Sequence, residues 1–445
     1  MSEKLYKLFP AEKDYYNGEK IMSKEFTLDG RNVYGTVFID KSQSFDSEAI
    51  EKAYFEVLRR NDAFRMRLVK TRKGIRQYFQ DVSLFPKPCH EKYDGDVDSF
   101  KKYCRTIKRP AISVYDPQVT MATIYTCNDG GAIIIWQHHI CSDGYSADNI
   151  TYNQINEFYD CYRNGEEPTK PDKEYSITYI IDRCEKNKKR NYKDLKWCFK
   201  QYMKEWYKFS IPVKPQKEDV KNIIIAEEFV GENYHKFNDL CKTLRCADTT
   251  VIMAAAAIIV YKETKKERFN FYTITHGRKN YIEKKISGAI APQFPVFYSI
   301  NMDTTIKDLI IDSYKNMLGF STHYHFTEMT TYATLEYPLR LLRVGYTKWF
   351  EWFFFNNMRD YSCDNNKTLE IMFLDQEIMS SQINFDILEP TNGTEGIRFE
   401  LSYSPLMIDN DKMEILRKEF LMTLEYMVNN LQGSIKECIE YVKGE

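Results

Sequence analysis

The sequence predicts an α/β protein made of two similar halves, each a mixed β-sheet covered by helices. Runs typical of strands alternate with runs typical of amphipathic helices through both parts of the chain. The length of 445 residues exceeds what one compact core usually holds. Residues 163–173 are polar, lack periodicity and contain one glycine and two prolines, as a linker does. We therefore expect an N-terminal subdomain over residues 1–170 and a C-terminal subdomain over residues 171–445.

The N-terminal half starts with a predicted helix and a predicted strand. Asp46 and Ser47 are residue types that cap helices, and the apolar residues after them recur at helical spacing. These apolar positions are Ile50, Ala53, Tyr54, Val57 and Leu58. Farther along, Phe64, Met66 and Leu68 alternate with arginines, which is the period of a half-exposed strand.

A hairpin and a helix are predicted next. Residues 119–126 and 131–137 are β-prone runs, and the turn-forming residues 128–131 join them. Because residues 133–136 are apolar at successive positions, the second strand should be covered on both faces. After residue 144, apolar residues recur at the spacing of an amphipathic helix. These are Ile155, Phe158, Tyr159 and Tyr162.

Two adjacent histidines lie between that strand and that helix. The chain has seven histidines, and this is its one adjacent pair. The motif reads His138, His139, Ile140, Cys141, Ser142, Asp143 and Gly144. It offers a base that works near neutral pH, an acid that can hold the base in place and a glycine that leaves room for substrate. The alternative is a structural pair of histidines that binds backbone carbonyls at a strand end.

The C-terminal half repeats the mixed pattern. We expect helices over residues 195–206, 249–261, 305–318 and 413–427, the second of them buried and rich in alanine. We expect strands over residues 223–225, 269–275, 383–387 and 397–403, with a turn over 390–396. The strand of 269–275 leads into His276, Gly277 and Arg278, and a segment over 288–296 precedes the third helix. The aromatic run over 349–355 reads as a strand plus a core helix, or as the lining of a lipid channel.

Composition excludes several classes of protein. The formal net charge is −1 and the charges are mixed in sign, which argues against a nucleic-acid or membrane-surface protein. The basic stretches 186–190 and 262–268 are interpreted as solvated faces. The start of the chain lacks a secretion-signal pattern, and the longest apolar run, 251–261, is too short to span a membrane. Eleven scattered cysteines indicate no metal site or disulfide framework, so we expect a cytoplasmic protein in which Cys141 is a small buried side chain.

The order of these motifs resembles the condensation domains of nonribosomal peptide synthetases, within the superfamily of chloramphenicol-acetyltransferase-like acyltransferases. The resemblance rests on the paired histidines with Asp143 and Gly144 after a buried strand, on Gly277 and Arg278, and on the segment 288–296. Residues 61–65 look like the early strand entry of the family, and the strands at 383–387 and 397–403 look like its last strand pair. The similarity runs from about Phe9 to Met427 and implies two α/β sandwich subdomains in a V, with a tunnel between them.

The resemblance also implies roles for single residues. His139 is the candidate base that removes a proton as an acceptor attacks an acyl thioester, a task for which an imidazole of ordinary pKa is suited. Asp143 would pair with Arg278 to hold the motif loop. His138 would support His139, and the backbone N–H of Gly144 would stabilise the oxyanion. Further candidates for the tunnel wall are Gln293, Ser142 and Tyr145.

The chain departs from the family pattern at two positions. Asn61 stands where the family usually has a histidine, and Gln293 stands where it has an asparagine, so pocket specificity differs. The Asp-Phe-Gly-Trp-Gly segment of plant acyltransferases is absent. No phosphopantetheine attachment site and no adenylation segment are present either, so we expect a stand-alone unit that meets its donor in trans.

Three functions remain open at the level of sequence. The first is amide formation, in which an acyl or aminoacyl group moves from a phosphopantetheine thioester to an amine. The donor would be an acyl or peptidyl carrier protein or coenzyme A, with no bound cofactor and no metal. The second is a CoA-dependent O-acyltransferase that forms an ester with an alcohol. The third is a catalytically silent protein that only docks a carrier. We expect a monomer, because two halves can form the site within one chain.

Overall fold

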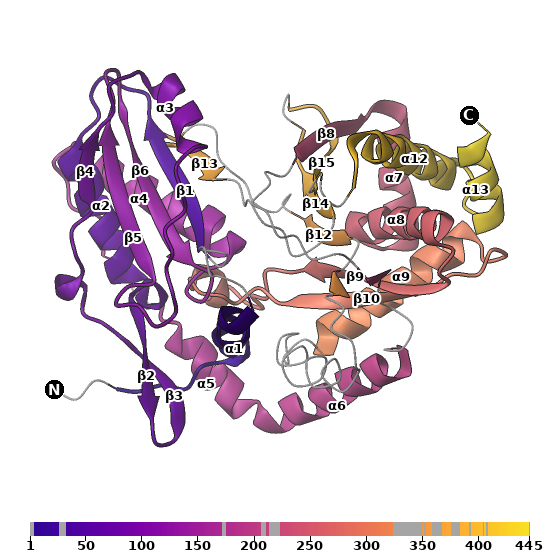
Figure 1. Ribbon diagram of the computed structural model, residues 1–445, viewed down its shortest axis with the longest axis horizontal. Coiled ribbons are helices and arrows are strands. Elements are labelled where there is room, and N and C mark those ends of the chain that lie inside the picture. Colours follow the sequence, from indigo (N-terminus) through magenta and orange to yellow (C-terminus); the bar gives the residue numbers. More distant parts are fainter. Residues whose placement is uncertain are drawn as a thin grey trace.

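Two β-sheets organise the computed structural model of the chain, one in each of the two lobes seen in Figure 1. The structure describes residues 4–25, 33–170, 175–205, 211–212, 223–323, 349–350, 353–357, 367–374, 383–390, 393–403, 405 and 408–444. The N-terminus lies beside one lobe and the C-terminus on the other (Figure 1). The predicted α/β architecture of two sheet-and-helix halves is therefore present.

The first sheet has five strands. In spatial order they are β13 (Glu370–Leu374), β1 (Val33–Asp40), β6 (Gly131–His138), β5 (Thr120–Thr126) and β4 (Cys89–Lys92). β5 and β6 pair antiparallel, with Thr120 opposite Gln137 and Thr126 opposite Gly131, so the predicted hairpin is confirmed. All eight residues of β6 are buried. This confirms a strand that is covered on both faces.

Helices cover both faces of the first sheet. The helices of this half are α1 (Pro10–Glu25), α2 (Ser47–Arg60), α3 (Val97–Cys104) and α4 (Tyr152–Arg163). Residues 133 and 135 of β6 pack into a core formed with α2 and α4, whereas residues 134 and 136 pack into a core formed with α3. The Asp46 carboxylate accepts the N–H groups at the start of α2, so the predicted cap is confirmed. β6 ends at His138, and the strand that leads to this residue is packed by helices on both faces.

The second sheet has six strands. In spatial order they are β10 (Gln293–Ser299), β9 (Arg268–Ile274), β12 (Phe353–Asn357), β14 (Ile383–Leu388), β15 (Gly396–Tyr403) and β8 (Ile223–Val230). The helices packed with it are α7 (Gly231–Leu244), α8 (Asp248–Thr264), α9 (Ile306–His323), α12 (Asn410–Asn429) and α13 (Ile435–Lys443). The strands and helices predicted for this region are present with slightly different bounds, and the helices α7 and α13 are additional.

α8 is the central helix of the second core. Residues 251–260 are at most 2% exposed, which confirms the buried, alanine-rich helix. In the described part of the chain, no single helix is long and apolar enough to cross a membrane. α7 and α8 pass that test only together, as a pair bent by 107°.

Two features of the sheets were not predicted. β13 comes from residues 370–374, yet it pairs with β1 in the first sheet. The second part of the chain therefore contributes to the first lobe, and the division at residue 170 stays a prediction. The aromatic run is strand at both described pieces, β11 (Trp349–Phe350) and β12, so the core helix expected there is wrong for these residues. Phe355 of β12 is fully buried in the second core.

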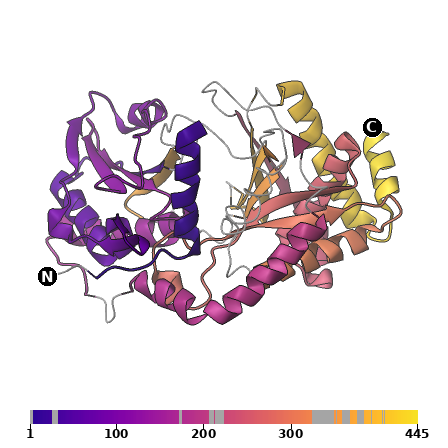
Figure 2. The same ribbon diagram turned by 60° about the horizontal axis from the view of Figure 1, so that its bottom comes forward.

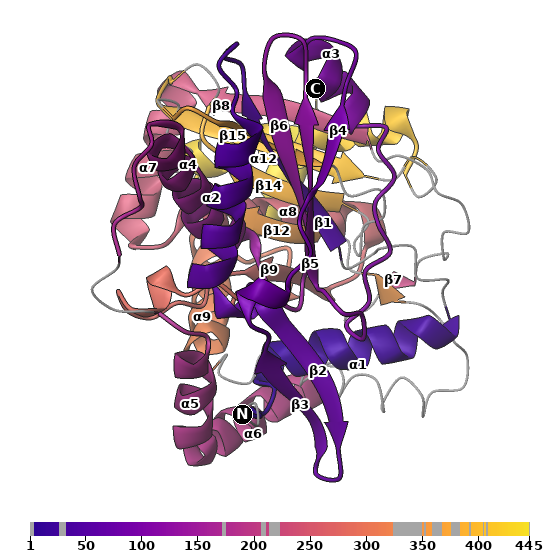
Figure 3. The same ribbon diagram turned by 90° about the vertical axis from the view of Figure 1, so that its left-hand side faces the viewer.

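Three helices lie between the two lobes or run from one to the other. α5 (Thr178–Lys186) and α6 (Lys188–Glu205) run from the first lobe to the second, and α1 stands between the lobes (Figure 2). Trp206, at the end of the helix predicted over 195–206, lies outside the described residues, as do residues 171–173 of the predicted linker. The smaller sheets are β2 (Met66–Thr71) with β3 (Gly74–Phe79), which projects from the first lobe in Figure 3, and β7 (Ile211–Pro212) with β11.

An apolar cluster joins these linking elements. It contains Phe9 and Ala11 of the α1 region, Ala63, Ile177, Ile180 and Ile181 of the α5 region, and Ile286 and Ile290 of the second half. α1 itself was missed, although Pro10 at its first position and Glu12, whose carboxylate accepts the Phe9 N–H at 3.0 Å, are start signals. The cluster holds the chain around residues 276–292 against the first lobe.

Candidate active site

His138 is the last residue of β6 and is fully buried. Its Nδ1 accepts the N–H of Ile140 at 3.0 Å, so the ring proton lies on Nε2. Nε2 then donates to the Glu19 carboxylate of α1 at 3.1 Å. His138 therefore fixes the turn after the strand and ties it to α1.

Glu19 remains a carboxylate although it is 2% exposed. Burial raises its pKa, but hydrogen bonds from His138, Ser113 and the Val114 N–H outweigh burial and lower the pKa below its usual value. A charged acceptor strengthens the hydrogen bond from His138. Sequence reasoning missed Glu19 because it precedes His138 by 119 residues and lies on a helix that was not predicted.

His139 lies between two tyrosines and is partly exposed. Its ring is stacked on Tyr15 of α1 with centroids 5.7 Å apart, and it meets the Tyr34 ring of β1 at 4.7 Å. Among the described residues, Nδ1 of His139 has no hydrogen-bond partner. The ring is thus held by aromatic contacts from two elements rather than by a carboxylate.

The pKa of His139 differs from the expected one. Burial, and then the neighbouring His138, lower the pKa to about 4. The prediction of an ordinary imidazole pKa is therefore wrong, because burial disfavours the cation. At neutral pH the ring is uncharged and able to accept a proton, but it holds that proton weakly.

Asp143 is the best-connected carboxylate of the motif. Its two oxygens accept six hydrogen bonds, from Ser146 N–H and Oγ, from both terminal nitrogens of Arg278, and from the N–H groups of Ile290 and Ala291. The distances from the Arg278 nitrogens are 3.0 and 3.1 Å. The structure therefore places Asp143 and Arg278 in the bidentate pair that was predicted.

The pair joins the two halves of the protein. The Arg278 side chain is 0% exposed, and its remaining donors go to the carbonyl oxygens of His276 and Ile286 and to Ser146 Oγ. Burial raises the pKa of Asp143, but the charge and hydrogen bonds of Arg278 outweigh burial and lower it. Removal of one member of such a pair typically costs about 3–5 kcal/mol. We call Asp143, Ser146, Arg278 and residues 286–291 the latch.

Gly277 sets the entry of Arg278 into the latch. Its φ is +67°, and a Cβ there would lie 2.5 Å from the carbonyl oxygen of Ile290. An L side chain would meet both a strained backbone and a clash with backbone. Glycine is therefore needed at position 277 for its backbone conformation, and arginine at position 278 for its charge.

Gly144 and Tyr145 lie on the open side of the motif. Gly144 is exposed, and a Cβ there would meet nothing within 4 Å. Tyr145, which was predicted to line the tunnel, lies beneath the Arg278 guanidinium at 4.4 Å from its ring centroid. It therefore supports the latch, as a cation–π partner.

The remaining residues singled out from the sequence, Ser142, Gln293 and Cys141, lie in different surroundings. Ser142 is fully buried, beside the Tyr34 phenol, which donates to Gln137 at 3.2 Å. Gln293 begins β10 opposite Ile274, and its side chain lies outside the described residues. Cys141 is fully buried, its thiol donates to the His138 carbonyl at 3.0 Å, and burial raises its pKa to about 12. Cys141 is thus the small buried side chain that was predicted, unsuited to act as a nucleophile.

Asn61 forms a second polar contact between the halves. Its side-chain oxygen accepts a hydrogen bond from Ser287 Oγ at 2.8 Å, and its amide donates to Val57 O at 2.8 Å and to Gln154 at 2.6 Å. Ser287 adjoins the latch. Asn61, which stands where the resemblance led us to expect a histidine, therefore makes a structural contact at the junction of the lobes.

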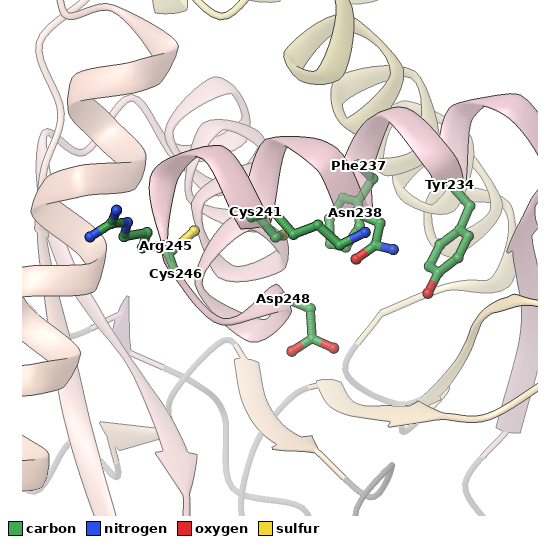
Figure 4. Close-up of a pocket in the computed structure, with 8 residues that line it drawn as sticks. Tyr234, Phe237, Asn238, Cys241, Arg245, Cys246 and Asp248 are labelled. Atoms are coloured by element: carbon green, nitrogen blue, oxygen red, sulfur yellow. The ribbon is translucent and has the colours of Figure 1, made fainter.

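The described residues offer no metal site. No group of three or more His, Cys, Asp or Glu among them could hold a metal ion. A cavity of about 400 Å³ lies beside the end of α7 and the start of α8 (Figure 4). Its lining includes Tyr234, Asn238 and Lys242, and none of the motif residues.

Comparison with known proteins agrees with this arrangement. A family model described as Condensation domain matches residues 29–441. Among curated proteins, surfactin synthase subunit 1 of Bacillus subtilis (strain 168) is 22% identical over 431 residues, which are 91% of this chain. The chain spans 11% of the length of that relative.

Solved structures share the fold at low identity. The first condensation domain of the calcium-dependent antibiotic synthetase, in complex with a substrate analogue, superposes with a TM-score of 0.75 at 13% identity, over 98% of this chain and 99% of that one. A variant of the starter condensation domain of rhizomide synthetase RzmA, in complex with C8-CoA, gives 0.74 at 13% identity, over 97% of each chain. A further variant, bound to C8-CoA and Leu-SNAC, gives 0.73 at 12% identity, over 97% of this chain and 96% of that one.

Proposed function

This chain belongs to the condensation-domain family, a family of amide-forming acyltransferases, and from that premise we propose that His139 is its catalytic base. In the proposed reaction an acyl or aminoacyl group moves from a thioester to an amine. The observation that carries this assignment is the state of His139, which directly follows the buried strand β6, is partly exposed and is neutral at pH 7.

The proposed step begins with attack of the amine nitrogen on the thioester carbonyl. A C–N bond forms, and His139 accepts the proton that the nitrogen loses. The carbonyl oxygen becomes an oxyanion, which the Gly144 N–H would stabilise. When the C–S bond breaks, the thiolate leaves and receives the proton from His139. Because a neutral amine already attacks well and the pKa of His139 is low, positioning of the two substrates supplies much of the rate.

We propose that the donor is a phosphopantetheine thioester, on a carrier protein supplied in trans or on coenzyme A. Support for coenzyme A comes from the RzmA starter domain, whose structure was solved with C8-CoA. Support for a carrier protein comes from the similarity to a segment of surfactin synthase subunit 1. We further propose a monomer, because the latch joins residues of both halves within one chain.

The test supplies C8-CoA as donor with Leu-SNAC as an amine acceptor, and an alcohol of matched size in a parallel reaction. Amide formation that is lost in His139→Ala is the expected result. His235→Ala is the matched control, since His235 is an exposed histidine on α7 in the other half. Undiminished amide formation in His139→Ala would show that His139 is not the base.

The same assay separates the alternatives. Ester formation with the alcohol, and none with the amine, would identify an O-acyltransferase. A carrier protein that binds while no donor in a panel of acyl thioesters is turned over would identify a docking protein. Exchange of C8-CoA for the octanoyl carrier protein then tells the two donor types apart.

A further inference from the structure

A group of buried polar side chains lies behind His139, and it differs from the latch in lacking partners. Within the described residues, several of their nitrogen and oxygen atoms are buried without a hydrogen bond. They are Thr36 Oγ1, Gln137 Nε2, Ser142 Oγ, both carboxylate oxygens of Asp148, and Thr151 Oγ1. We call these five residues the rear pocket. Buried polar atoms are normally paired, so such a group requires partners other than these side chains.

The strand register shows that these residues share one region. Along β1, Phe38 stacks on Tyr152 at 6.3 Å, and Asp40 accepts a hydrogen bond from Tyr159 at 2.8 Å. α4 therefore runs along β1 in the same direction. One turn before Tyr152, Asp148 lies near Tyr34, the next residue of β1 on that face after Thr36.

The other members of the rear pocket adjoin this point. Gln137 of β6 lies opposite Tyr34, and its side-chain oxygen accepts a hydrogen bond from the Tyr34 hydroxyl. Ser142 lies beside the same phenol. Thr151 follows Asp148 on η3 (Ser146–Thr151), a π-helical turn that widens the start of α4. π-helical turns of this kind occur often at functional sites.

Asp148 is the charged member of the rear pocket. It is 3% exposed. The ionisable groups that interact with it are Asp143 of the motif and Tyr34 of β1, and Cys141 and Arg278 lie next to these two groups. Arg278 is committed to Asp143, and burial raises the pKa values of Tyr34 and Cys141, so both are neutral at pH 7. Burial, and then the charge of Asp143, raise the pKa of Asp148 to about 7.

His139 needs an anion when it accepts a proton. The proton creates an imidazolium at a buried position, where burial disfavours a cation. Asp143 is already neutralised by Arg278 and by four further hydrogen bonds. Asp148 shares the neighbour Tyr34 with His139, and neither of its carboxylate oxygens has a partner among the described residues.

We propose that Asp148 is a positioning residue for His139, and that water held by the rear pocket links its carboxylate to the His139 ring and balances the charge which that ring gains. The inference rests on the proposed function, since it assumes that His139 receives the proton. The amine N–H bond breaks, the proton moves to His139 and then to the leaving sulfur. Asp148 acts in its ionised form and takes no proton from His139.

A crystal structure of the full chain at a resolution that shows water tests the link directly. The expected result is ordered water within hydrogen-bonding distance of Asp148 and, singly or in a chain, of Ser142 and His139. A dry rear pocket, or an Asp148 side chain turned to another partner, would overturn the proposal. This measurement does not depend on which substrates the protein uses.

Kinetics then distinguish positioning from a structural role. With C8-CoA and Leu-SNAC, Asp148→Asn should lower kcat about tenfold with little change in KM, and the loss of activity below about pH 7 should disappear. Asp40→Asn is the matched control. It removes a buried carboxylate on the same face of β1, at the end away from His139, and should keep the wild-type pH profile.

Two outcomes separate this inference from the proposed function. A wild-type pH profile and kcat in Asp148→Asn, together with an inactive His139→Ala, would overturn the role of Asp148 alone. An active His139→Ala would instead remove the proposed base, and the water link seen in the crystal would then have to serve another group. Asp148→Ser, which is smaller and also neutral, should reproduce Asp148→Asn if the charge is what matters.

Discussion

Asp143 and Asp148 are buried carboxylates five residues apart, yet their surroundings are opposite. Asp143 belongs to the latch, where it accepts six hydrogen bonds, two of them from the Arg278 guanidinium. Asp148 belongs to the rear pocket, where neither oxygen has a partner among the described residues. The pKa of the first is lowered and that of the second is raised to about 7.

Two carboxylates in one short segment therefore have different roles. Asp143 holds the structure together, and Asp148 is the one that we propose to act in the reaction. A saturated carboxylate fixes geometry, because every displacement breaks several hydrogen bonds at once. A buried carboxylate that lacks hydrogen-bond partners lowers stability, and proteins keep such groups mainly where function needs them. The latch therefore explains how the lobes are joined, and the rear pocket points to the reaction.

The largest expected effect comes from breaking the latch. Arg278→Met should lower the free energy of unfolding by about 3–5 kcal/mol at pH 7, because it leaves Asp143 charged and unpaired in a buried place. Urea denaturation followed by circular dichroism measures it. The double variant Asp143→Leu, Arg278→Met should be more stable than Arg278→Met alone. A loss below about 1 kcal/mol would mean that Asp143 finds other partners.

The rear pocket should respond in the opposite direction. Asp148→Asn should raise the free energy of unfolding by about 2–4 kcal/mol at pH 8 and by little at pH 4. The pKa of Asp148 is higher in the folded than in the unfolded protein, so wild-type stability falls as the pH rises from about 4 to 7. Above that range, removal of the carboxylate restores the free energy of unfolding that the wild-type protein has lost. Equal effects at both pH values would show that the pKa of Asp148 is not raised by folding.

Two glycines sharpen the account of the latch. Gly277→Ala should destabilise by about 2–3 kcal/mol, because it combines a positive φ with a clash against Ile290 O. Gly165→Ala has a similar φ of +74° but no atom within 4 Å of the new Cβ, so it should cost about 1 kcal/mol. Thermal unfolding of the two variants measures the difference. Equal losses would assign the whole effect to backbone strain.

The smallest effect on stability is expected at Gly144. Gly144→Ala should change the free energy of unfolding by less than about 0.5 kcal/mol, since its Cβ enters open space. If that space receives the substrates, KM should rise while stability stays constant. Steady-state kinetics with C8-CoA and Leu-SNAC provide the readout. An unchanged KM would place the reacting groups away from Gly144.

Much of this arrangement could be predicted from sequence because its signals are local. Residues 133–136 are apolar without interruption, and the strand that they form is buried on both faces. The helical spacing after Gly144 predicted α4, and Asp46 predicted the start of α2. The pairing of Asp143 with Arg278 followed from the family resemblance and not from spacing, since 135 residues separate them.

Other features have no local signal. Glu19 pairs with His138 from a helix that prediction missed, and β13 reaches the first sheet from residues 370–374. The pKa of His139 was expected to be ordinary and is lowered to about 4, because the fold buries the ring. None of these contacts joins neighbours in the chain.

By itself, the sequence determined which residue types the site contains and which elements carry them, because periodicity and turn chemistry act over a few residues. The tertiary structure alone decided which carboxylate is paired and which is left without a partner, and which histidine is held by Glu19 and which by aromatic rings. The physical reason is that burial, charge balance and hydrogen-bond satisfaction depend on neighbours in space. In this fold, those neighbours of the motif come from α1, β1 and the second lobe.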